Sequence, residues 1–246
     1  MSYVIGTGFC ESSRYDAVAF FSYWLTHIKA YTNPDHIFVL DQVDRTLAGV
    51  SVADTIVGYK RSKIHYGAMN MSIVPSGNLG HVHQLIKAEQ PFKNHQLCGW
   101  SASVLALAML AYNAERDFVY VEQDCLLVGR IVDAIIREAD EKKKDMLFGS
   151  CKIMNAAQSL FFIRHKFIPR FVMEYLMGPA DTDPHCRPEK KFCYLERSCA
   201  ANVGRFSFGI DRDRPIPWGT ELFYVQHLTT EELEQGIKNG TFFRAY

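Results

Sequence analysis

The chain has 246 residues, 48% apolar and 22% charged, which is long enough to bury a substantial core in one globular domain. Its 27 Lys and Arg residues balance 27 Asp and Glu residues, which argues against a nucleic-acid-binding protein. Its seven scattered cysteines, the lack of a signal-like start and the lack of an apolar run of about 20 residues predict a reduced, cytoplasmic protein without a transmembrane segment.

The first sixty residues alternate between short apolar runs and one amphipathic segment. Residues 3–5 predict a strand that ends at a Gly-Thr-Gly turn. From residue 15 to 28, apolar residues recur at the i, i+3, i+4 spacing of a helix, with Ser13 as its candidate cap. Buried strands are then predicted over residues 36–40 and 54–59. This strand–helix–strand order favours parallel pairing with a right-handed crossover.

The middle of the chain contains the strongest pair of expected elements. Breakers make residues 60–96 irregular, and an Ala- and Leu-rich helix is then expected over Gly99–Asn113. A buried strand over Asp117–Val121 runs directly into Glu122-Gln123-Asp124. Further on, residues 178–217 are expected to be loop-rich. The remaining expected elements are helices over about 130–139 and 167–177, and strands over 146–153, 159–163 and 223–228.

The acidic residues after the middle strand are the first candidate site. In an extended segment, Glu122 and Asp124 present both carboxylates on one side of the chain. Ligands bind beyond the carboxyl ends of strands in open parallel sheets, and oxygen ligands suit Mg²⁺ or Mn²⁺. A metal there would stabilise a departing diphosphate as a Lewis acid. The same pair is also compatible with a solvated turn or a helix cap.

The segment from Gly99-Trp100-Ser101-Ala102 through the strand to Glu122-Gln123-Asp124 resembles the core of GT-A glycosyltransferases. The resemblance implies an α/β fold: a single GT-A-like domain over 1–246 with a mostly parallel, Rossmann-like central sheet flanked by helices. It divides the chain into a nucleotide-binding half, about 1–125, and an acceptor-binding half, about 126–246. It implies a nucleotide-diphosphate sugar donor, a glycan or other hydroxyl acceptor, and Mn²⁺ or Mg²⁺ held by an acid-x-acid motif, with Asp124 the firmer ligand and Glu122 the second.

The resemblance extends to two further acidic or imidazole side chains. Asp41, at the end of the second strand, matches an acidic residue that reaches the donor nucleoside. His227, in a late strand, matches a histidine that supplies a further metal or diphosphate ligand. Both residues also allow structural explanations, because Asp often ends a strand and His227 precedes a capping box at 229–232.

The resemblance also places candidate donor-binding residues outside the metal motif. Thr7 and Gly8 follow the first strand, where the nucleotide pocket of the family begins, and Trp100 opens the helix that precedes the motif strand. Lys60 belongs to a small cationic group with Arg61 and Lys63 that would face the diphosphate, although a solvated surface explains such charges equally well.

An inverting reaction would need a carboxylate base to deprotonate the acceptor. Asp181, Asp183 and Glu189 fall in the stretch where the family places it, and Glu189 resembles a helix start. A retaining reaction would need no such base. The loop Asp211-Arg212-Asp213-Arg214 is expected to form either a mobile flap over the donor or a self-paired surface turn.

Other classes of site fit the sequence less well. The third glycine of a dinucleotide fingerprint is missing, because position 11 is Glu, and no P-loop motif occurs. The spacing of Cys186, Cys193 and Cys199 does not match that of structural zinc sites. A sugar-phosphate nucleotidyltransferase, which shares the α/β core but opens on a basic Gly-rich loop, and a catalytically silent GT-A-like binding module both stay open.

Overall fold

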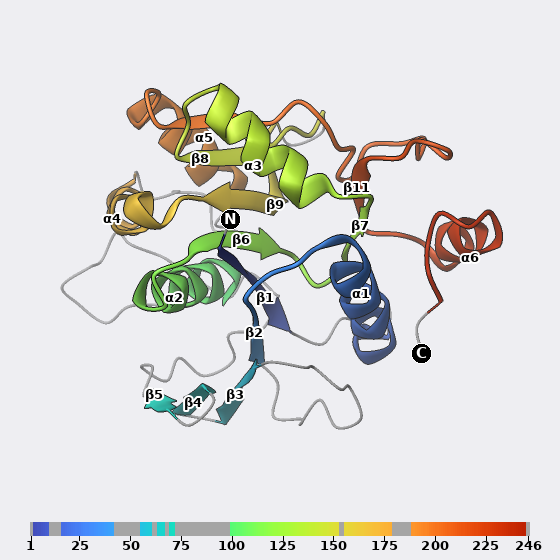
Figure 1. The fold of residues 1–246 in the computed structure, drawn as a ribbon, viewed down its shortest axis with the longest axis horizontal. Coiled ribbons are helices and arrows are strands. Elements are labelled where there is room, and N and C mark those ends of the chain that lie inside the picture. Colours follow the sequence, from blue (N-terminus) through green and yellow to red (C-terminus); the bar gives the residue numbers. More distant parts are fainter. Residues whose placement is uncertain are drawn as a thin grey trace.

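The computed structural model describes residues 2–9, 16–41, 55–60, 63–66, 69–71, 99–152, 155–178 and 188–244. Its strands are β1 (Tyr3–Phe9), β2 (His36–Asp41), β3 (Thr55–Lys60), β4 (Lys63–Tyr66), β5 (Met69–Met71), β6 (Asp117–Val121), β7 (Cys125–Val128), β8 (Met146–Gly149), β9 (Ala157–Ile163), β10 (Val203–Arg205) and β11 (Phe223–Gln226). Its helices are α1 (Ala17–Tyr31), α2 (Gly99–Asn113), α3 (Ile131–Glu141), the 3-10 turn η1 (His165–Phe167), α4 (Ile168–Met177), α5 (Pro188–Ser198) and α6 (Thr230–Lys238). Strands and helices are mixed along the chain, as Figure 1 shows.

One large sheet runs through the described part of the chain, in the order β10-β8-β9-β6-β1-β2-β3-β4-β5. Parallel pairing joins β6, β1, β2 and β3, while β9 runs antiparallel to both of its neighbours and β4 to both of its own. Because β10 is parallel to β8, all of these strands except β9 and β4 point the same way. The expected mostly parallel sheet is therefore confirmed. A separate antiparallel pair, β7 and β11, forms a second small sheet.

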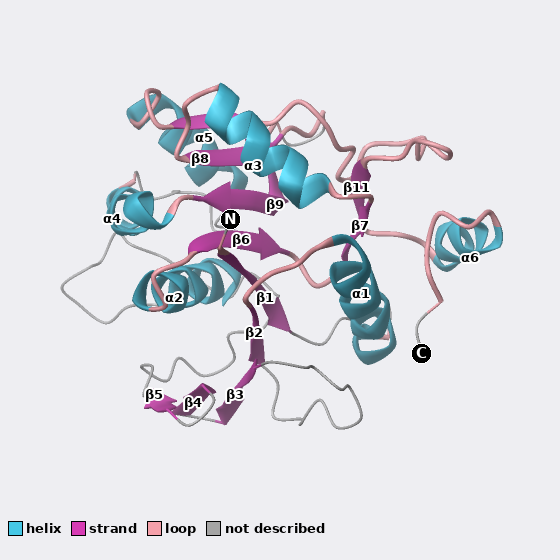
Figure 2. Ribbon diagram, viewed as in Figure 1, coloured by secondary structure: helices cyan, strands magenta, loops and turns pink. Residues whose placement is uncertain are grey.

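Each face of the large sheet has its own hydrophobic core. Side chains alternate between the two faces along a strand, so Val4 and Ile5 of β1 belong to different cores. One core gathers apolar residues of α1, α3, β7 and β11, including the stacked Phe21 and Trp24. The other gathers α2, α4 and α5, including Trp100. Helices thus flank the sheet on both sides (Figure 2).

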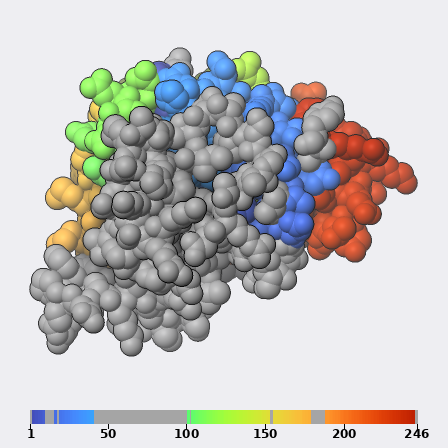
Figure 3. All heavy atoms as spheres, turned by 90° about the horizontal axis from the view of Figure 1, so that it is seen from below, coloured from blue at the N-terminus to red at the C-terminus, as the bar shows by residue number. Residues whose placement is uncertain are grey.

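The C-terminal segment joins the core that contains α1. Phe242 is buried, and the backbone N–H of Phe243 donates to His27 Nε2 on α1 (3.2 Å). In the space-filling view, the C-terminal residues accordingly lie against α1 (Figure 3). None of the helices in the described ranges combines the length and apolarity that a bilayer span requires.

Two expected elements agree with the structure to the residue. The helix Gly99–Asn113 and the strand Asp117–Val121 are confirmed with both ends as predicted. The helix expected over 167–177 is also confirmed as α4, preceded by a 3-10 turn. These segments have strong local patterns and lie next to the candidate site.

The Gly-Thr-Gly turn expected after the first strand is wrong. Strand β1 instead continues through Gly6, Thr7 and Gly8, which pair with β2. The reason lies in packing: a Cβ on Gly6 would come within 2.7 Å of the ring of Phe118, so glycine here makes room inside the sheet. A glycine inside a strand can thus mark close packing rather than a turn.

The stretch predicted as loop-rich, 178–217, contains α5 and β10, and the irregular stretch 60–96 contains β4 and β5. Strand β7, directly after the acidic motif, was not anticipated either. These elements are short or rich in charged residues, so their periodicity is weak in sequence. Pairing stabilises the strands, and burial stabilises α5 and β7.

Candidate functional site

Glu122, Gln123 and Asp124 lie at the carboxyl end of β6, between the large and the small sheet. Their exposed fractions are 3%, 2% and 3%. The backbone N–H of Cys125 donates to the carbonyl of Glu122 (2.9 Å), which closes a tight turn into β7. Burial of three consecutive polar side chains contradicts a solvated turn, since buried carboxylates require specific partners.

The last residue of β11 and the residue after it supply the partners of Asp124. Antiparallel pairing sets Gln226 opposite Cys125, so the end of β11 lies beside the acidic motif. Gln226 Nε2 donates to Asp124 Oδ1 (2.8 Å), and His227 Nε2 lies 3.4 Å from Asp124 Oδ2. His227 has a left-handed φ of 56°, which turns the chain at this point. The sequence-predicted Asp124 and His227 are therefore brought together.

A second layer of charged and polar residues surrounds this pair. Ser159 of β9 donates to the carboxylate of Asp211, a residue that is 3% exposed. Arg212 Nε donates to Gln226 Oε1 (3.0 Å), and its Nη1 lies 3.8 Å from Glu189 Oε1. With its amide nitrogen facing that carboxylate, Gln158 donates to both oxygens of Glu189 (2.9 and 3.1 Å).

The loop from 211 to 214 is not the self-paired surface turn that was one of the two expectations for it, while the mobile flap stays a prediction. Each of its four charged residues pairs with a different part of the chain, so it is not a self-paired turn. Asp213 accepts from the backbone N–H of Lys152 (3.2 Å), and Arg214 pairs with Glu232 (2.6 Å). The side chains of Asp211 and Arg212 contact Ser159 and Gln226, which are buried. The loop thus borders the carboxylate cluster, by which we mean Glu122, Asp124, Glu189 and Asp211.

The charges of the carboxylate cluster shift the pKa values of Glu122 and Arg212. Burial, and next the Asp124 carboxylate, raise the pKa of Glu122 well above its usual range, while Arg212 opposes this shift. Burial alone would lower the pKa of Arg212, but Glu122, Asp211 and Glu189 outweigh it and raise that pKa. With Asp124 as the fourth, the carboxylates of Glu122, Asp211 and Glu189 all act on the Arg212 guanidinium.

The donor atoms fit a divalent cation in part. Asp124 Oδ2 and His227 Nε2 lie side by side, and Mn²⁺ or Mg²⁺ accepts two protein ligands together with phosphate oxygens and water. In the ranges that the structure describes, no three His, Cys, Asp or Glu side chains form a ready-made metal site. The Asp124 carboxylate acts on Glu122 through its charge, and the role of Glu122 as a metal ligand stays a prediction.

The other predicted site residues are placed as follows. Thr7 on β1 is fully buried, and its hydroxyl has no hydrogen-bond partner among the described residues, while Gly8 continues the strand. Trp100 packs edge-to-face on Tyr120 within the core, away from solvent.

Asp41 ends β2 and Lys60 ends β3 as backbone positions, and their side chains lie outside the described set. Asp181 and Asp183 lie outside the described residues.

Three polar residues of the cluster had no place in the sequence analysis: Gln158, Ser159 and Gln226. All three lie in buried strands that are otherwise mostly apolar. That is the signal that would have found them, because a buried polar side chain in such a strand requires a partner inside the protein.

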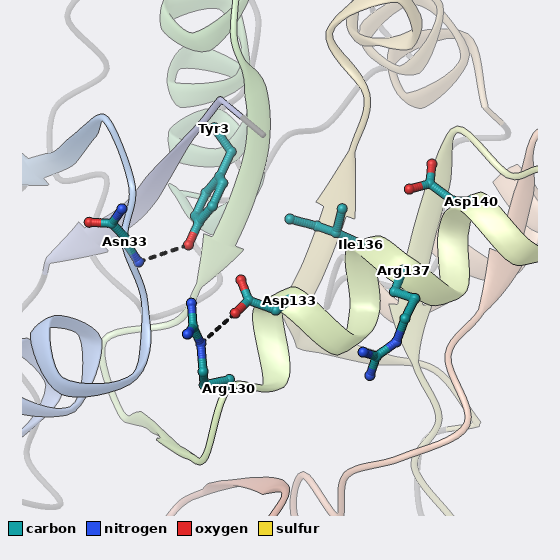
Figure 4. A pocket seen from close by; sticks show the side chains of 7 residues that line it. All are labelled: Tyr3, Asn33, Arg130, Asp133, Ile136, Arg137 and Asp140. Atoms are coloured by element: carbon teal, nitrogen blue, oxygen red, sulfur yellow. Dashed lines mark hydrogen bonds and ion pairs between the residues drawn. The ribbon is translucent and has the colours of Figure 1, made fainter.

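A cavity of about 310 Å³ lies elsewhere, lined by residues of β1, α3 and the segment before β2. In Figure 4 the Tyr3 hydroxyl meets the backbone of Asn33, and Arg130 pairs with Asp133. Tyr3 begins β1, so this cavity is at the amino end of the parallel strands, whereas Glu122 and Asp124 follow the carboxyl end of β6. The cavity and the carboxylate cluster therefore lie at opposite ends of the parallel strands.

No protein-family model matches the chain, and no curated protein matches it in sequence. Solved structures do resemble it. The apo form of the glycosyltransferase GlyE from Streptococcus pneumoniae TIGR4 aligns with 100% of this chain and 65% of its own, at a TM-score of 0.53 and 8% identity. Mouse xyloside xylosyltransferase 1 aligns with 100% of this chain and 95% of its own, at a TM-score of 0.49 and 6% identity. A putative glucose-1-phosphate thymidylyltransferase from Bacillus anthracis aligns with 95% of this chain and 92% of its own, at a TM-score of 0.44 and 11% identity.

The chain spans 65% of that GlyE chain and about half, 45%, of the chain in a second GlyE structure. At 8% identity, the likeness to GlyE concerns the fold. The molecule has a glycosyltransferase-like mixed α/β fold, with the carboxylate cluster at the carboxyl end of its central strands.

Proposed function

We propose that this protein is a metal-dependent glycosyltransferase that moves a sugar from a nucleotide-diphosphate sugar to an acceptor hydroxyl. The observation that carries the proposal is Asp124, buried at the carboxyl end of β6 and adjacent to His227. Ligands bind at this end of the strands in open α/β sheets. The glycosyltransferase-like fold supports the same reaction class.

The chemistry requires positive charge where the leaving diphosphate develops negative charge. Asp124 and His227 would hold Mn²⁺ or Mg²⁺, which supplies Lewis acidity to the diphosphate when bound. Arg212 adds a fixed guanidinium to the same cluster, close to Glu189. In this proposal residues 1–125 bind the nucleotide, with Thr7, Gly8, Asp41 and Lys60 as its candidate contacts, and residues 126–246 bind the acceptor.

Glu189 is the proposed base if the reaction inverts the anomeric centre. Its carboxylate is engaged by Arg212 and Gln158, and these contacts hold it in place beside the cluster. A base must lie within hydrogen-bond reach of the acceptor hydroxyl. Glu189→Gln would then reduce transfer far more than it weakens donor binding. Asp183 stays a second candidate from the sequence.

The first test is a thermal-shift panel of UDP, GDP, CDP and ADP, each with and without Mn²⁺. A nucleotide at 100 times its dissociation constant adds about 2.7 kcal/mol, which corresponds to roughly 5–10 °C in Tm for a chain of this size. We expect a shift with one nucleotide that depends on Mn²⁺ and is lost in Asp124→Asn. The matched control Asp133→Asn, on α3, should retain it.

The alternatives give different results. A nucleotidyltransferase would release pyrophosphate from a nucleoside triphosphate and a sugar phosphate, and would show no hydrolysis of nucleotide-sugars. A silent binding module would bind its ligand equally well in Asp124→Asn and without Mn²⁺. If no diphosphate gives a metal-linked shift, the proposed donor site is wrong.

A further inference from the structure

Gln226 connects Asp124 to a residue that the metal site does not itself use. Its side chain is fully buried at the end of β11. The amide nitrogen donates to Asp124 Oδ1 (2.8 Å), and the amide oxygen accepts from Arg212 Nε (3.0 Å). Both ends of one amide are therefore engaged, which fixes the plane of the amide and the direction of each bond.

Arg212 is itself held from several sides. Its Nη1 lies 3.8 Å from Glu189, and 24% of its side chain is exposed. The adjacent Asp211 is anchored by Ser159, and its carbonyl accepts from the backbone N–H of Gln226 (2.8 Å). The guanidinium therefore approaches Gln226 from a constrained backbone.

Arg214 fixes the other side of the same turn. Its Nη2 donates to the carbonyl of Gln226 (3.3 Å) and to the carbonyl of His227 (3.1 Å). These bonds hold the left-handed turn at His227. The imidazole and the amide are thus set by one framework, and both face Asp124.

We infer that Gln226, held by Arg212, is a positioning residue for the metal ligand Asp124. The bond to Oδ1 stops the carboxylate from rotating and leaves Oδ2 directed to His227. Hydrogen bonds behind a metal ligand set its orientation, and their loss typically weakens metal binding about 10–100-fold. This inference rests on the proposed function.

The chemistry of the side chain explains why glutamine suits this position. A glutamate has no N–H to donate and would set a third carboxylate against Asp124 and Glu122. A methionine of similar length fills the space but makes neither bond. The substitution Gln226→Met therefore separates hydrogen bonding from packing.

The experiment measures binding of Mn²⁺ alone to the full chain, using the electron paramagnetic resonance signal of free Mn²⁺. Four proteins are compared: wild type, Gln226→Met, Arg212→Lys and Gln235→Met. The last is a matched control on the exposed face of α6. Arg212→Lys keeps the positive charge, so it changes the direction of the bond and leaves the charge of the cluster constant. The Tm of each protein in EDTA reports folding separately.

We expect Gln226→Met to bind Mn²⁺ about 10–100-fold more weakly and Arg212→Lys about tenfold more weakly, while Gln235→Met binds as wild type. Wild-type affinity in a folded Gln226→Met protein would overturn the inference. If that variant does not fold, wild-type affinity in Arg212→Lys would overturn it. Failure of the wild type to bind Mn²⁺ would overturn the inference before any variant is compared, whereas the proposed function is contradicted only when the nucleotide panel also gives no metal-linked shift.

Discussion

His27 on α1 illustrates how a single buried residue is held in one protonation state. Its Nε2 accepts from the backbone N–H of Phe243 (3.2 Å), so the ring proton resides on Nδ1, which donates to the carbonyl of Leu127 (2.7 Å). Burial lowers the pKa of His27 to about 4, although the Leu127 carbonyl acts in the opposite direction. The neutral ring thereby joins α1, β7 and the C-terminal segment.

The lowered pKa of His27 predicts that the free energy of unfolding depends on pH. The unfolded histidine has a pKa of about 6.5, so below that pH the unfolded state takes up the proton first. The contribution of His27 is complete above pH 6.5 and is lost as the pH falls toward 4, by about 3 kcal/mol in total. Urea unfolding of wild type and His27→Gln at several pH values should show the difference in free energy of unfolding shrinking over that range. A difference that is constant with pH would contradict the assigned neutral state.

At the scale of an element, helix α6 is tied to the site through its cap. The Thr229 hydroxyl accepts from the N–H of Glu232 (3.2 Å), and Glu232 accepts from the N–H of Thr229 (3.0 Å). The capping box expected from sequence is confirmed. Glu232 also pairs with Arg214, which holds the backbone at Gln226 and His227. The start of this helix therefore supports the turn that carries the imidazole.

The cap can be tested by two substitutions. Thr229→Ala removes the hydroxyl acceptor and should lower the free energy of unfolding by about 1 kcal/mol, whereas Thr229→Ser should retain most of it. Thermal unfolding would show a decrease of roughly 2–4 °C for the alanine variant. Equal Tm values for the two variants would mean that the cap contributes nothing to stability.

At the scale of the whole molecule, the two sheets meet around the ring of Tyr224. This β11 residue is fully buried, and a Cβ on Gly149 of β8 would lie 2.0 Å from its hydroxyl oxygen. A Cβ on Gly209 would lie 1.9 Å from the same ring. The glycines allow the tyrosine to pass between segments far apart in sequence. Close packing here sets the small sheet, and with it Gln226 and His227, against the large one.

A double-mutant cycle tests this contact. Gly149→Ala should cost about 1–3 kcal/mol, because overpacking a close-packed interior forces shifts. Tyr224→Phe removes the oxygen nearest to the new methyl group, and that hydroxyl has no hydrogen-bond partner among the described residues. The double variant should recover about 0.5 kcal/mol or more of the loss in urea unfolding. Strict additivity would show that the two residues do not meet as described.

The sequence alone determined the parts of the site that depend on local pattern. Helix Gly99–Asn113 and strand Asp117–Val121 were predicted to the residue, because each has a periodicity that is complete within its own length. The alternation of strands and helices predicted the mostly parallel sheet. Together they placed Glu122 and Asp124 at a carboxyl strand end, where ligands bind.

The tertiary structure decided what surrounds those carboxylates. Gln226 meets Asp124 across 102 positions of sequence, and Ser159 meets Asp211 across 52. Such contacts depend on the pairing of β7 with β11 and on the path of the loop at 211–214, which no short window of sequence specifies. A polar side chain in a buried strand requires a partner, but the sequence does not say which one. Only the folded chain brings Arg212, Gln226 and His227 to the same carboxylate.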